Sequence, residues 1–426
     1  MENKHTMSDL YQMQSLPLSA KISMTARRIN EWVNEFGEDG VYLSFSGGKD
    51  STVLGHIIRE VCGYKNIPFV FVDVPTQYPE LKEFAQTFDN LVILKPKISF
   101  AEVCEKYGFP MFSKEISECV EDSRKYIRIL TDRQTDRQTE IPFAYRIADL
   151  IGIDRRTDKE NKAFVDLKTG NIPSEILKAP IRVKQLFGVK CENFGSMYDR
   201  SKYLFMLNAP FEVSNQCCKV MKKQPMHKYN KDTGRVPITA QMASESKLRT
   251  SQWLQNGCNG FDLKIPTSNP MSFWAEQDVL LYIKENAKSM IEVRMSDDKM
   301  FYGNRIVYKK TGESVENTEF YFPICSVYGD VVTDYSAMGQ CDNQMSFADY
   351  GIFDNERPLL KTTGCQRTGC VLCGFGCHLE KESRFLRLKE THPKFHNLLY
   401  VLKNNGVTYA EAIDWVNEHG NMNIKY

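Results

Sequence analysis

The chain of 426 residues lacks long apolar runs and any marked excess of charge. No stretch approaches the roughly 20 consecutive apolar residues that a membrane-spanning helix needs, and the first residues lack the apolar core of a signal peptide. Lysine and arginine total 55 against 54 aspartates and glutamates, so the net charge of +1 provides no general attraction to nucleic acid or to an anionic membrane. We therefore predict a cytoplasmic protein without membrane contact, whose partners must be identified from individual sites.

Cysteine, by contrast, is abundant, with 13 residues in the chain. A reducing compartment argues against a disulfide framework, so clustered thiols indicate metal or redox chemistry. Scattered cysteines are typical of small buried residues; here they are Cys62, Cys104, Cys119, Cys191, Cys258, Cys325 and Cys341.

Short apolar segments alternate with segments of helical spacing along the chain, which predicts an α/β fold. Strands are expected at 41–45, 68–72, 91–94 and 236–240, with strand-like pieces at 305–308 and 321–324; helices are expected around 22–33, 53–61, 81–88, 273–283, 394–403 and 408–418. This alternation predicts a doubly wound, Rossmann-like parallel sheet covered by helices on both faces. Ligands of such sheets bind at the carboxyl ends of the strands.

Changes in composition divide the chain into four expected segments. They are the first half of a nucleotide-binding domain (1–112), a charged helical insertion (113–208), the second half of the domain (209–290), and a small insertion followed by a cysteine-rich segment and C-terminal helices (291–426). The first insertion interleaves aromatics with the basic residues Arg124, Lys125, Arg128, Arg133, Arg137, Arg146, Arg155 and Arg156. This pattern is compatible with a nucleic-acid surface, although a solvated charged helix explains it more simply.

The segment Ser46-Gly47-Gly48-Lys49-Asp50-Ser51 joins the first expected strand to the helix that follows it. Glycines let the backbone approach an anion closely, and the start of a helix presents unpaired N–H groups. Lys49 adds a full positive charge. Only one residue separates Gly48 from Asp50, so the segment is not a G-x-x-x-x-G-K-[ST] loop. The pattern nevertheless predicts a turn that binds phosphate.

This hexapeptide resembles the PP-loop, S-G-G-x-D-S, of the ATP pyrophosphatase and phosphoadenosine phosphosulfate (PAPS) reductase superfamily, whose fold is also called adenine nucleotide alpha hydrolase-like. In that family the loop holds the phosphates of a nucleotide, commonly ATP that is cleaved between its α and β phosphates. The resemblance implies catalytic roles for Lys49, Asp50 and Ser51, with Asp50 placing a Mg²⁺ ion. The nucleotide contacts that it implies are Ser44, Ser46, Gly47, Gly48, Lys49, Asp50, Ser51, Asp73 and Arg249.

Three further segments resemble motifs of this family, with departures from the family pattern at some positions. Residues 73–80 read D-V-P-T-Q-Y-P-E in place of D-T-G-x-x-[FY]-P-E-T, and Asp73 at a strand end can accept a hydrogen bond from ribose or adenine. Residues 240–249 keep the E-S and the last arginine, Arg249, of G-x-R-x-x-E-S-x-x-R but lose the first arginine, so part of the family's anion contacts is missing. Residues 269–283 resemble P-L-x-x-W-x-x-x-D-V-x-x-Y-I, whose aromatics, Trp274 and Tyr282, are expected in the core.

Two pairs of cysteines form the second constellation. Cys217 and Cys218 are adjacent, and Cys370-Val371-Leu372-Cys373 lies far downstream between Cys365 and Cys377. C-x-x-C spacing lets two thiolates bind one metal centre, and a distant pair can complete four sulfur ligands, as in zinc or iron–sulfur sites. The side chains of adjacent cysteines tend to diverge, which favours a larger cluster and leaves zinc as the alternative.

Residues 217–225, C-C-K-V-M-K-K-Q-P, resemble the C-C-x-x-x-K-x-x-P segment of adenylylsulfate (APS) reductases, whose cysteines hold a [4Fe–4S] cluster. The resemblance implies that Cys217, Cys218, Cys370 and Cys373 hold such a cluster, with Cys365 or Cys377 as a substitute ligand. Residues 367–376 are similar to the tail of a PAPS-reductase-like branch. Sulfonucleotide reductases also carry a C-terminal cysteine in a C-G-L-H tail, and residues 421–426 contain none.

Three functions are compatible with these resemblances. The leading hypothesis is that ATP adenylylates a substrate and a sulfur species then displaces AMP, as in PP-loop tRNA thiolases. The first alternative is a sulfonucleotide reductase that converts APS or PAPS to sulfite, and the second is a regulatory nucleotide-binding module with a structural cluster. The expected cofactors are ATP (or APS or PAPS), Mg²⁺ and a [4Fe–4S] cluster or zinc. The expected partners are an adenine nucleotide and a donor of sulfur or electrons.

Overall fold

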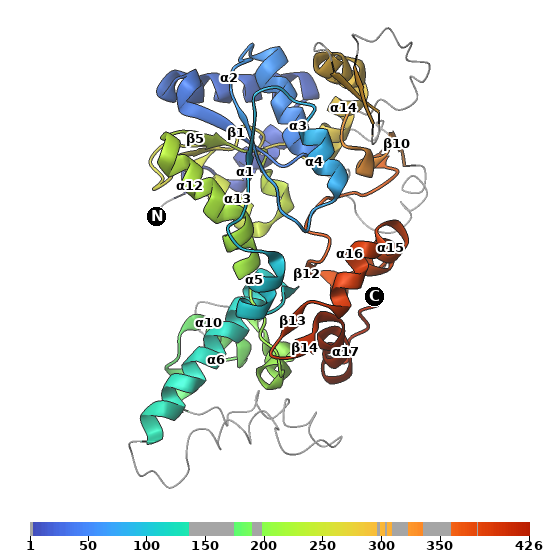
Figure 1. The fold of residues 1–426 in the computed structure, drawn as a ribbon. Helices are drawn as coiled ribbons and strands as arrows, with labels where there is room; N and C mark the ends of the chain where they lie inside the picture. The colour runs from blue at the N-terminus through green and yellow to red at the C-terminus, as the bar shows by residue number, and fades with distance from the viewer. Residues whose placement is uncertain are drawn as a thin grey trace, which may run out of the picture. The chain divides into compact units, whose positions relative to one another are not determined.

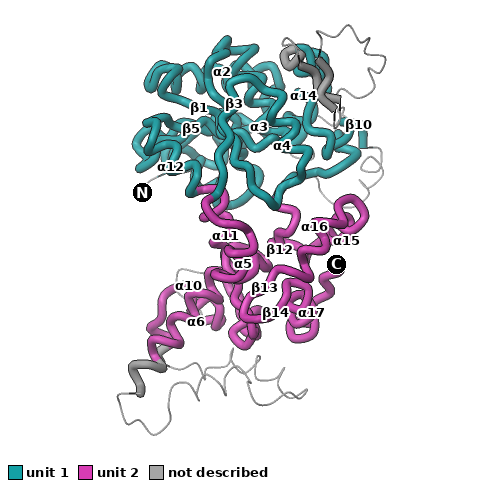
Figure 2. The backbone as a smooth tube through the Cα atoms, viewed as in Figure 1, with its two compact units in different colours: residues 1–96, 224–369 teal, residues 97–223, 370–426 magenta. Residues whose placement is uncertain are grey.

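The computed structural model describes residues 3–135, 174–189, 198–295, 299–302, 305–308, 323–334, 359–380 and 382–426. The chain forms two compact units, each assembled from separate pieces of sequence (Figure 2). Unit 1 comprises Met1–Pro96 and Gln224–Gly369, and unit 2 comprises Lys97–Lys223 and Cys370–Tyr426. The division into four segments that the composition predicts (1–112, 113–208, 209–290 and 291–426) stays a prediction.

Unit 1 contains a six-stranded sheet in the order β3-β2-β1-β5-β7-β6. Its strands are β1 (Val41–Phe45), β2 (Phe69–Val72), β3 (Leu91–Leu94), β5 (Val236–Ile238), β6 (Asn259–Gly260) and β7 (Thr267–Ser268). All neighbouring pairs are parallel except β6 with β7. The continuous apolar runs of β1 and β2 are buried, as expected for parallel strands with both faces covered. The predicted parallel α/β sheet is therefore confirmed, and β1 lies at its switch point, where β2 pairs on one side and β5 on the other.

Helices surround this sheet (Figure 1). They are α1 (Met7–Gln14), α2 (Leu18–Phe36), α3 (Lys49–His56), which continues as a π turn over Ile57–Val61, α4 (Pro79–Ala85), α12 (Gln224–Thr233), α13 (Lys247–Asn256) and α14 (Glu276–Met295). Trp274 and Tyr282 are almost completely buried, which confirms their predicted place in the core.

The other described parts of unit 1 include two antiparallel strand pairs and the 3-10 turns Glu38–Gly40, Ala243–Glu245 and Ser326–Tyr328. β8 (Lys299–Tyr302) pairs with β9 (Arg305–Tyr308), as the strand-like pattern at 305–308 predicts. A 3-10 turn (Ser326–Tyr328) precedes β10 (Val331–Thr333), which pairs with β11 (Leu360–Thr362). Of the strand predicted at 321–324, residues 321 and 322 lie outside the described residues, and residues 323 and 324 form a bend.

Unit 2 is mainly helical. Its described elements are α5 (Phe100–Tyr107), β4 (Met111–Phe112), α6 (Lys114–Thr135), α9 (Ser174–Leu177), α10 (Ile181–Leu186), a 3-10 helix (Ser201–Asn208), α11 (Gln216–Cys218) with a π turn (Lys219–Lys223), β12 (Gly374–Phe375), a 3-10 turn (Cys377–Leu379), α15 (Arg384–Thr391), α16 (Pro393–His396), a 3-10 turn (Asn397–Tyr400), β13 (Lys403–Asn404), β14 (Val407–Thr408) and α17 (Tyr409–Gly420). β12 pairs with β4, which attaches the segment after the C-x-x-C motif to the start of the unit. The Phe109 ring stacks on Tyr409 with 4.5 Å between centroids.

Within the segment expected to be a basic insertion, α6 is a helix, and its side chains Arg124, Lys125 and Arg128 form ion pairs within unit 2. The Arg124 guanidinium donates to the carbonyl oxygens of Met206 (2.6 Å), Ala209 (2.9 Å) and Phe211 (2.8 Å). Arg124 also pairs with the Glu212 carboxylate at 2.7 Å, and Arg128 pairs with the same carboxylate at 2.9 Å. Arg124, whose side chain is 10% exposed, therefore has a structural role in unit 2. The side chains of Arg133, Arg137, Arg146, Arg155 and Arg156 lie outside the described residues.

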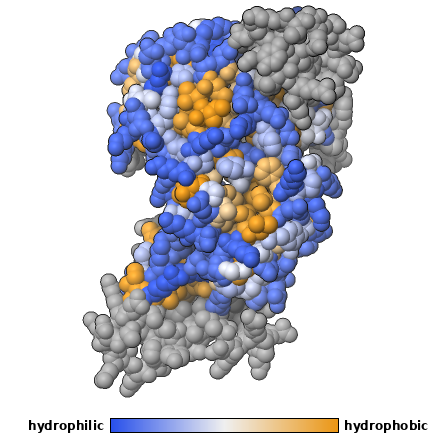
Figure 3. Space-filling view, viewed as in Figure 1, coloured by the Kyte–Doolittle hydropathy of each residue, from blue (hydrophilic) through white to orange (hydrophobic). Residues whose placement is uncertain are grey.

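The coloured face in Figure 3 carries hydrophilic side chains over much of its area, with scattered apolar patches between them. Isolated exposed apolar side chains are normal on protein surfaces. Within the described part of the chain, no helix combines the length and apolar character required to cross a bilayer.

Candidate functional site: a phosphate loop and a cysteine group

The loop between β1 and α3 has a geometry that only glycine satisfies at its centre. Gly47 has a φ of +71°, in the left-handed region, and a Cβ placed on it would lie 3.0 Å from the Leu81 carbonyl oxygen. Any side chain here would be strained and would also press on the backbone of α4. The glycine pair thus shapes the turn itself.

Hydroxyl groups fix the rest of the loop. The Ser46 and Ser51 hydroxyls lie 3.0 Å apart, and the Ser46 hydroxyl accepts a hydrogen bond from Gly48 N at 3.2 Å. The Ser51 hydroxyl donates to Gly48 O at 2.9 Å. The first helical bond of α3 runs from Thr52 N to Gly48 O, so the preceding amides of the helix have no intrahelical acceptor. This terminus offers N–H donors and a partial positive charge to an anion.

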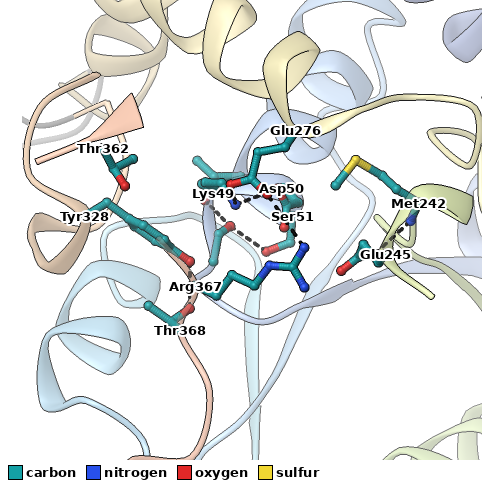
Figure 4. Close-up of polar contacts among 12 residues, drawn as sticks. Lys49, Asp50, Ser51, Met242, Glu245, Glu276, Tyr328, Thr362, Arg367 and Thr368 are labelled. Carbon is teal, nitrogen blue, oxygen red and sulfur yellow. Dashed lines mark hydrogen bonds and ion pairs between the residues drawn. The ribbon is translucent and has the colours of Figure 1, made fainter. Parts of the chain in front are cut away.

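Lys49 is the most deeply buried charged group of the site, with its side chain only 2% exposed. Its ammonium lies 3.3 Å from Asp50 Oδ1, 3.1 Å from Glu276 Oε1 and 5.7 Å from the centroid of the Tyr328 ring (Figure 4). A buried ammonium requires such partners, because an isolated charge is costly to remove from water. The sequence predicted that Lys49 lies in the loop. The structure adds that the charge of its ammonium is balanced by the carboxylates of Asp50 and Glu276.

Asp50 carries an oxygen that suits a divalent cation. Its Oδ1 is buried without a hydrogen-bond partner, although Lys49 is close. Burial raises the pKa of Asp50, Lys49 lowers it and Glu276 raises it, with a net upward shift. A buried carboxylate oxygen with spare acceptor capacity beside a phosphate loop is the kind of ligand that Mg²⁺ takes. The residues present therefore fit the expected ion, which Asp50 would hold.

Four residues of this site were not among the predicted contacts: Glu276, Tyr328, Arg367 and Thr368. Arg367 Nη2 lies 3.7 Å from Glu276 Oε2. The Tyr328 hydroxyl lies 2.6 Å from the Thr368 hydroxyl, and the same Tyr328 oxygen would be 3.2 Å from a Cβ on Gly48. Arg367 and Glu276 belong to the segments whose resemblance was noted, 367–376 and 269–283, whereas the sequence around Tyr328 contains no such signal.

The remaining predicted contacts occupy strand ends and helix starts in unit 1. Asp73 directly follows β2, as predicted, but its carboxylate accepts a hydrogen bond from Lys82 of α4 at 2.7 Å. Arg249 on α13 forms an ion pair with Glu245. Burial lowers the pKa of Arg249, as does the neighbouring charge of Arg367, while Asp50 opposes them. These interactions place Arg249 within the electrostatic field of the loop. Ser44 is half-buried in β1, in register with Val70.

The four predicted cysteine ligands lie in unit 2. Cys217 and Cys218 belong to α11, and Cys370 and Cys373 form a turn before β12, with Cys373 N donating to Cys370 O at 3.1 Å. A hydrogen bond from the Cys217 thiol lowers the pKa of Cys218, burial opposes this shift, and nearby lysines reinforce it. The same hydrogen bond raises the pKa of Cys217, as do burial and the thiols of Cys218, Cys373 and Cys370. The four thiols thus form one electrostatic group.

Lys222 supplies positive charge to this group. Burial lowers the pKa of its ammonium. The thiols of Cys370 and Cys218 raise this pKa by more, so the net shift is upward. Lys222 is the lysine of the C-C-x-x-x-K-x-x-P pattern, so the sequence contained the signal. An ammonium beside several thiolates stabilises their deprotonated form, which is the form that binds metal.

Two occupants are expected at these thiols, an iron–sulfur cluster and a zinc ion. Across the described ranges, no three side chains of histidine, cysteine, aspartate or glutamate come close enough together to hold one metal ion. Thiolates are ligands of both zinc and iron–sulfur centres, so the residue types of this group are compatible with either occupant.

The two substitute ligands are engaged elsewhere. The buried Cys365 lies in unit 1, where its thiol is 3.8 Å from the Tyr78 hydroxyl. The Cys377 thiol donates to Gly374 O at 2.9 Å, and burial raises its pKa to about 12. These contacts disfavour either cysteine as a replacement ligand.

Comparison with known proteins gave one result. The family model described as "Phosphoadenosine phosphosulfate reductase domain" matches residues 40–134 and 150–373, more than half of the chain. The match begins just before β1 and ends at Cys373, so it spans the phosphate loop and all four cysteines. No curated protein and no solved structure matches the chain.

Proposed function

The chain belongs to the phosphoadenosine phosphosulfate reductase domain family, and we propose that it is an enzyme that binds ATP and cleaves it between the α and β phosphates to adenylylate a substrate. The observation that carries this proposal is the loop at 46–51, where the start of α3 is formed by Lys49, whose ammonium is buried. A nucleotide's phosphates would lie on these two positive groups.

The proposed reaction is a displacement at the α phosphorus. An oxygen of the acceptor attacks this phosphorus, the bond to the bridging oxygen of the β phosphate breaks, and pyrophosphate leaves. Lys49 and the amides at the start of α3 stabilise the charge that develops on the leaving pyrophosphate. Asp50 would hold Mg²⁺, which supplies further neutralisation of the phosphates when bound. A sulfur donor would then displace AMP from the activated acceptor.

The cysteine group supports a role in sulfur chemistry. We assign Cys217, Cys218, Cys370 and Cys373 as ligands of a [4Fe–4S] cluster, which when bound would supply a redox-active, sulfur-binding centre. Lys222 would balance the negative charge of the thiolates. Zinc at the same residues is the alternative occupant.

A sulfonucleotide reductase is the second candidate, because the matching family is described by that activity. Such an enzyme would bind APS or PAPS, whose sulfate is already activated, and release sulfite with electrons from a thiol donor. The same loop would then hold phosphates without releasing pyrophosphate.

One experiment separates these proposals. The protein is purified anaerobically, analysed for iron, sulfide and zinc, and incubated with ATP and candidate acceptors, including tRNA and DNA, which also tests a nucleic-acid contact through the basic insertion. Release of pyrophosphate and AMP supports adenylylation. Release of sulfite from APS or PAPS, without pyrophosphate from ATP, would establish the reductase instead. Nucleotide binding without any turnover by the cluster-loaded protein would favour a regulatory module.

A further inference from the structure

Glu276 bridges two cations at the phosphate loop. It is the first residue of α14, and one of its carboxylate oxygens lies 3.1 Å from Lys49 Nζ. The other carboxylate oxygen lies 3.7 Å from Arg367 Nη2. Each oxygen of this carboxylate therefore faces a different positive side chain.

This arrangement is the one that a phosphate group adopts between a lysine and an arginine. A phosphate presents several oxygens to surrounding donors, and lysine and arginine are its usual side-chain partners. Glu276 is one-third exposed and Arg367 is 64% exposed, so both side chains remain accessible from solvent. Lys49, in contrast, is buried and cannot turn to a new partner without losing one that it has.

We propose that Glu276 is an internal anion that occupies, in the nucleotide-free protein, the place on Lys49 and Arg367 that phosphate oxygens take when a nucleotide binds. The inference rests on the proposed function, because it assumes that phosphates bind at this loop. It adds that binding is an exchange of anions, in which a phosphate replaces the Glu276 carboxylate on both cations.

The exchange predicts in which direction the affinity for phosphate changes when Glu276 loses its charge. If Glu276 competes with phosphate, removal of its charge frees Lys49 and Arg367 and strengthens phosphate binding. If Glu276 instead holds Lys49 in position for phosphate, or binds a metal ion that accompanies the nucleotide, removal of its charge weakens binding. The two roles are therefore separated by the direction of one change in affinity.

The test compares the Glu276→Gln variant with the wild-type protein by isothermal titration calorimetry. Inorganic pyrophosphate and ATP are titrated separately, each in buffer with EDTA and in buffer with Mg²⁺. Glu285→Gln is the matched control, because Glu285 is exposed on the same helix. Thermal unfolding of each variant checks that the fold is intact.

We expect Glu276→Gln to bind pyrophosphate about two- to fivefold more tightly than the wild type in EDTA, which corresponds to the energy of partly exposed ion pairs. Glu285→Gln should bind as the wild type does. Equal or weaker binding by a folded Glu276→Gln variant, with or without Mg²⁺, would overturn this inference and leave the proposed nucleotide site standing. Absence of pyrophosphate and ATP binding in all three proteins would overturn the proposed function as well.

Discussion

Replacement of Gly47 by alanine tests the claim that the loop is shaped by close packing as well as by backbone conformation. Gly47 has a φ of +71°, and a Cβ at this position would lie 3.0 Å from the carbonyl oxygen of Leu81 and 3.3 Å from a methyl group of its side chain. The new methyl group therefore meets backbone that cannot rotate away.

The expected cost has two parts. An L-residue in the left-handed region costs about 1–2 kcal/mol, and an additional methyl group in a filled space costs about 1–3 kcal/mol. The sum is about 2–5 kcal/mol. Gly63 provides the matched control, because its φ is +83° and a Cβ there would meet no atom within 4 Å. Gly63→Ala should therefore cost only the first part, about 1–2 kcal/mol.

Urea unfolding measures the two free energies, and calorimetry measures ATP affinity. We expect Gly47→Ala to be the less stable variant and to bind ATP at least about tenfold more weakly than the wild type, because a displaced loop no longer directs its amides at the phosphates. Gly63→Ala should retain wild-type affinity. Equal losses of stability in the two variants, or unchanged ATP binding by Gly47→Ala, would refute the packing argument.

Two further predictions concern unit 2. Cys370→Ser should reduce the iron and sulfide content of anaerobically purified protein to below about half that of the wild type. The control is Cys377→Ser, which should leave both contents unchanged because the Cys377 thiol donates to a backbone carbonyl. Equal contents in the two variants would remove Cys370 from the ligand set. Burial raises the pKa of Glu212, but Arg124 and Arg128 lower it more, so the pKa lies below its ordinary value of 4.5. The ion pairs of Glu212 therefore stabilise the fold above pH 4.5, and this stabilisation is lost as the pH falls through the lowered pKa. Glu212→Gln should therefore cost about 1 kcal/mol of unfolding free energy at pH 7 and progressively less below pH 4.5 in urea titrations, and a pH-independent cost would contradict the ion pair.

Local patterns in the sequence predicted the elements that build the site. The apolar runs at 41–45 and 68–72 became β1 and β2 because parallel strands with both faces buried are continuously apolar. The two glycines predicted the turn, since Gly47 needs its positive φ. The aromatics Trp274 and Tyr282 are buried, as the resemblance at 269–283 implied.

Contacts between distant segments could not be predicted in this way. Glu276 reaches Lys49 from the start of α14, and Arg367 reaches Glu276 from the loop that follows β11. No local periodicity in the sequence records such contacts. In place of one helix at 394–403, α16 is followed by a 3-10 turn (Asn397–Tyr400), and Lys403 then pairs with Thr408 in a hairpin. The Asn-Gly dipeptide at 405–406, where both residues have positive φ, was the available signal for that hairpin.

The central claim is that the phosphates of an adenine nucleotide bind at Lys49 in the loop at 46–51. Calorimetric titration of ATP into the wild-type protein and into Lys49→Gln, with unfolding curves recorded for both, tests it most directly. The account predicts measurable binding to the wild type and at least about tenfold weaker binding to a folded Lys49→Gln variant, because a charged partner of the phosphates is lost. Equal ATP affinity in the two proteins would contradict it.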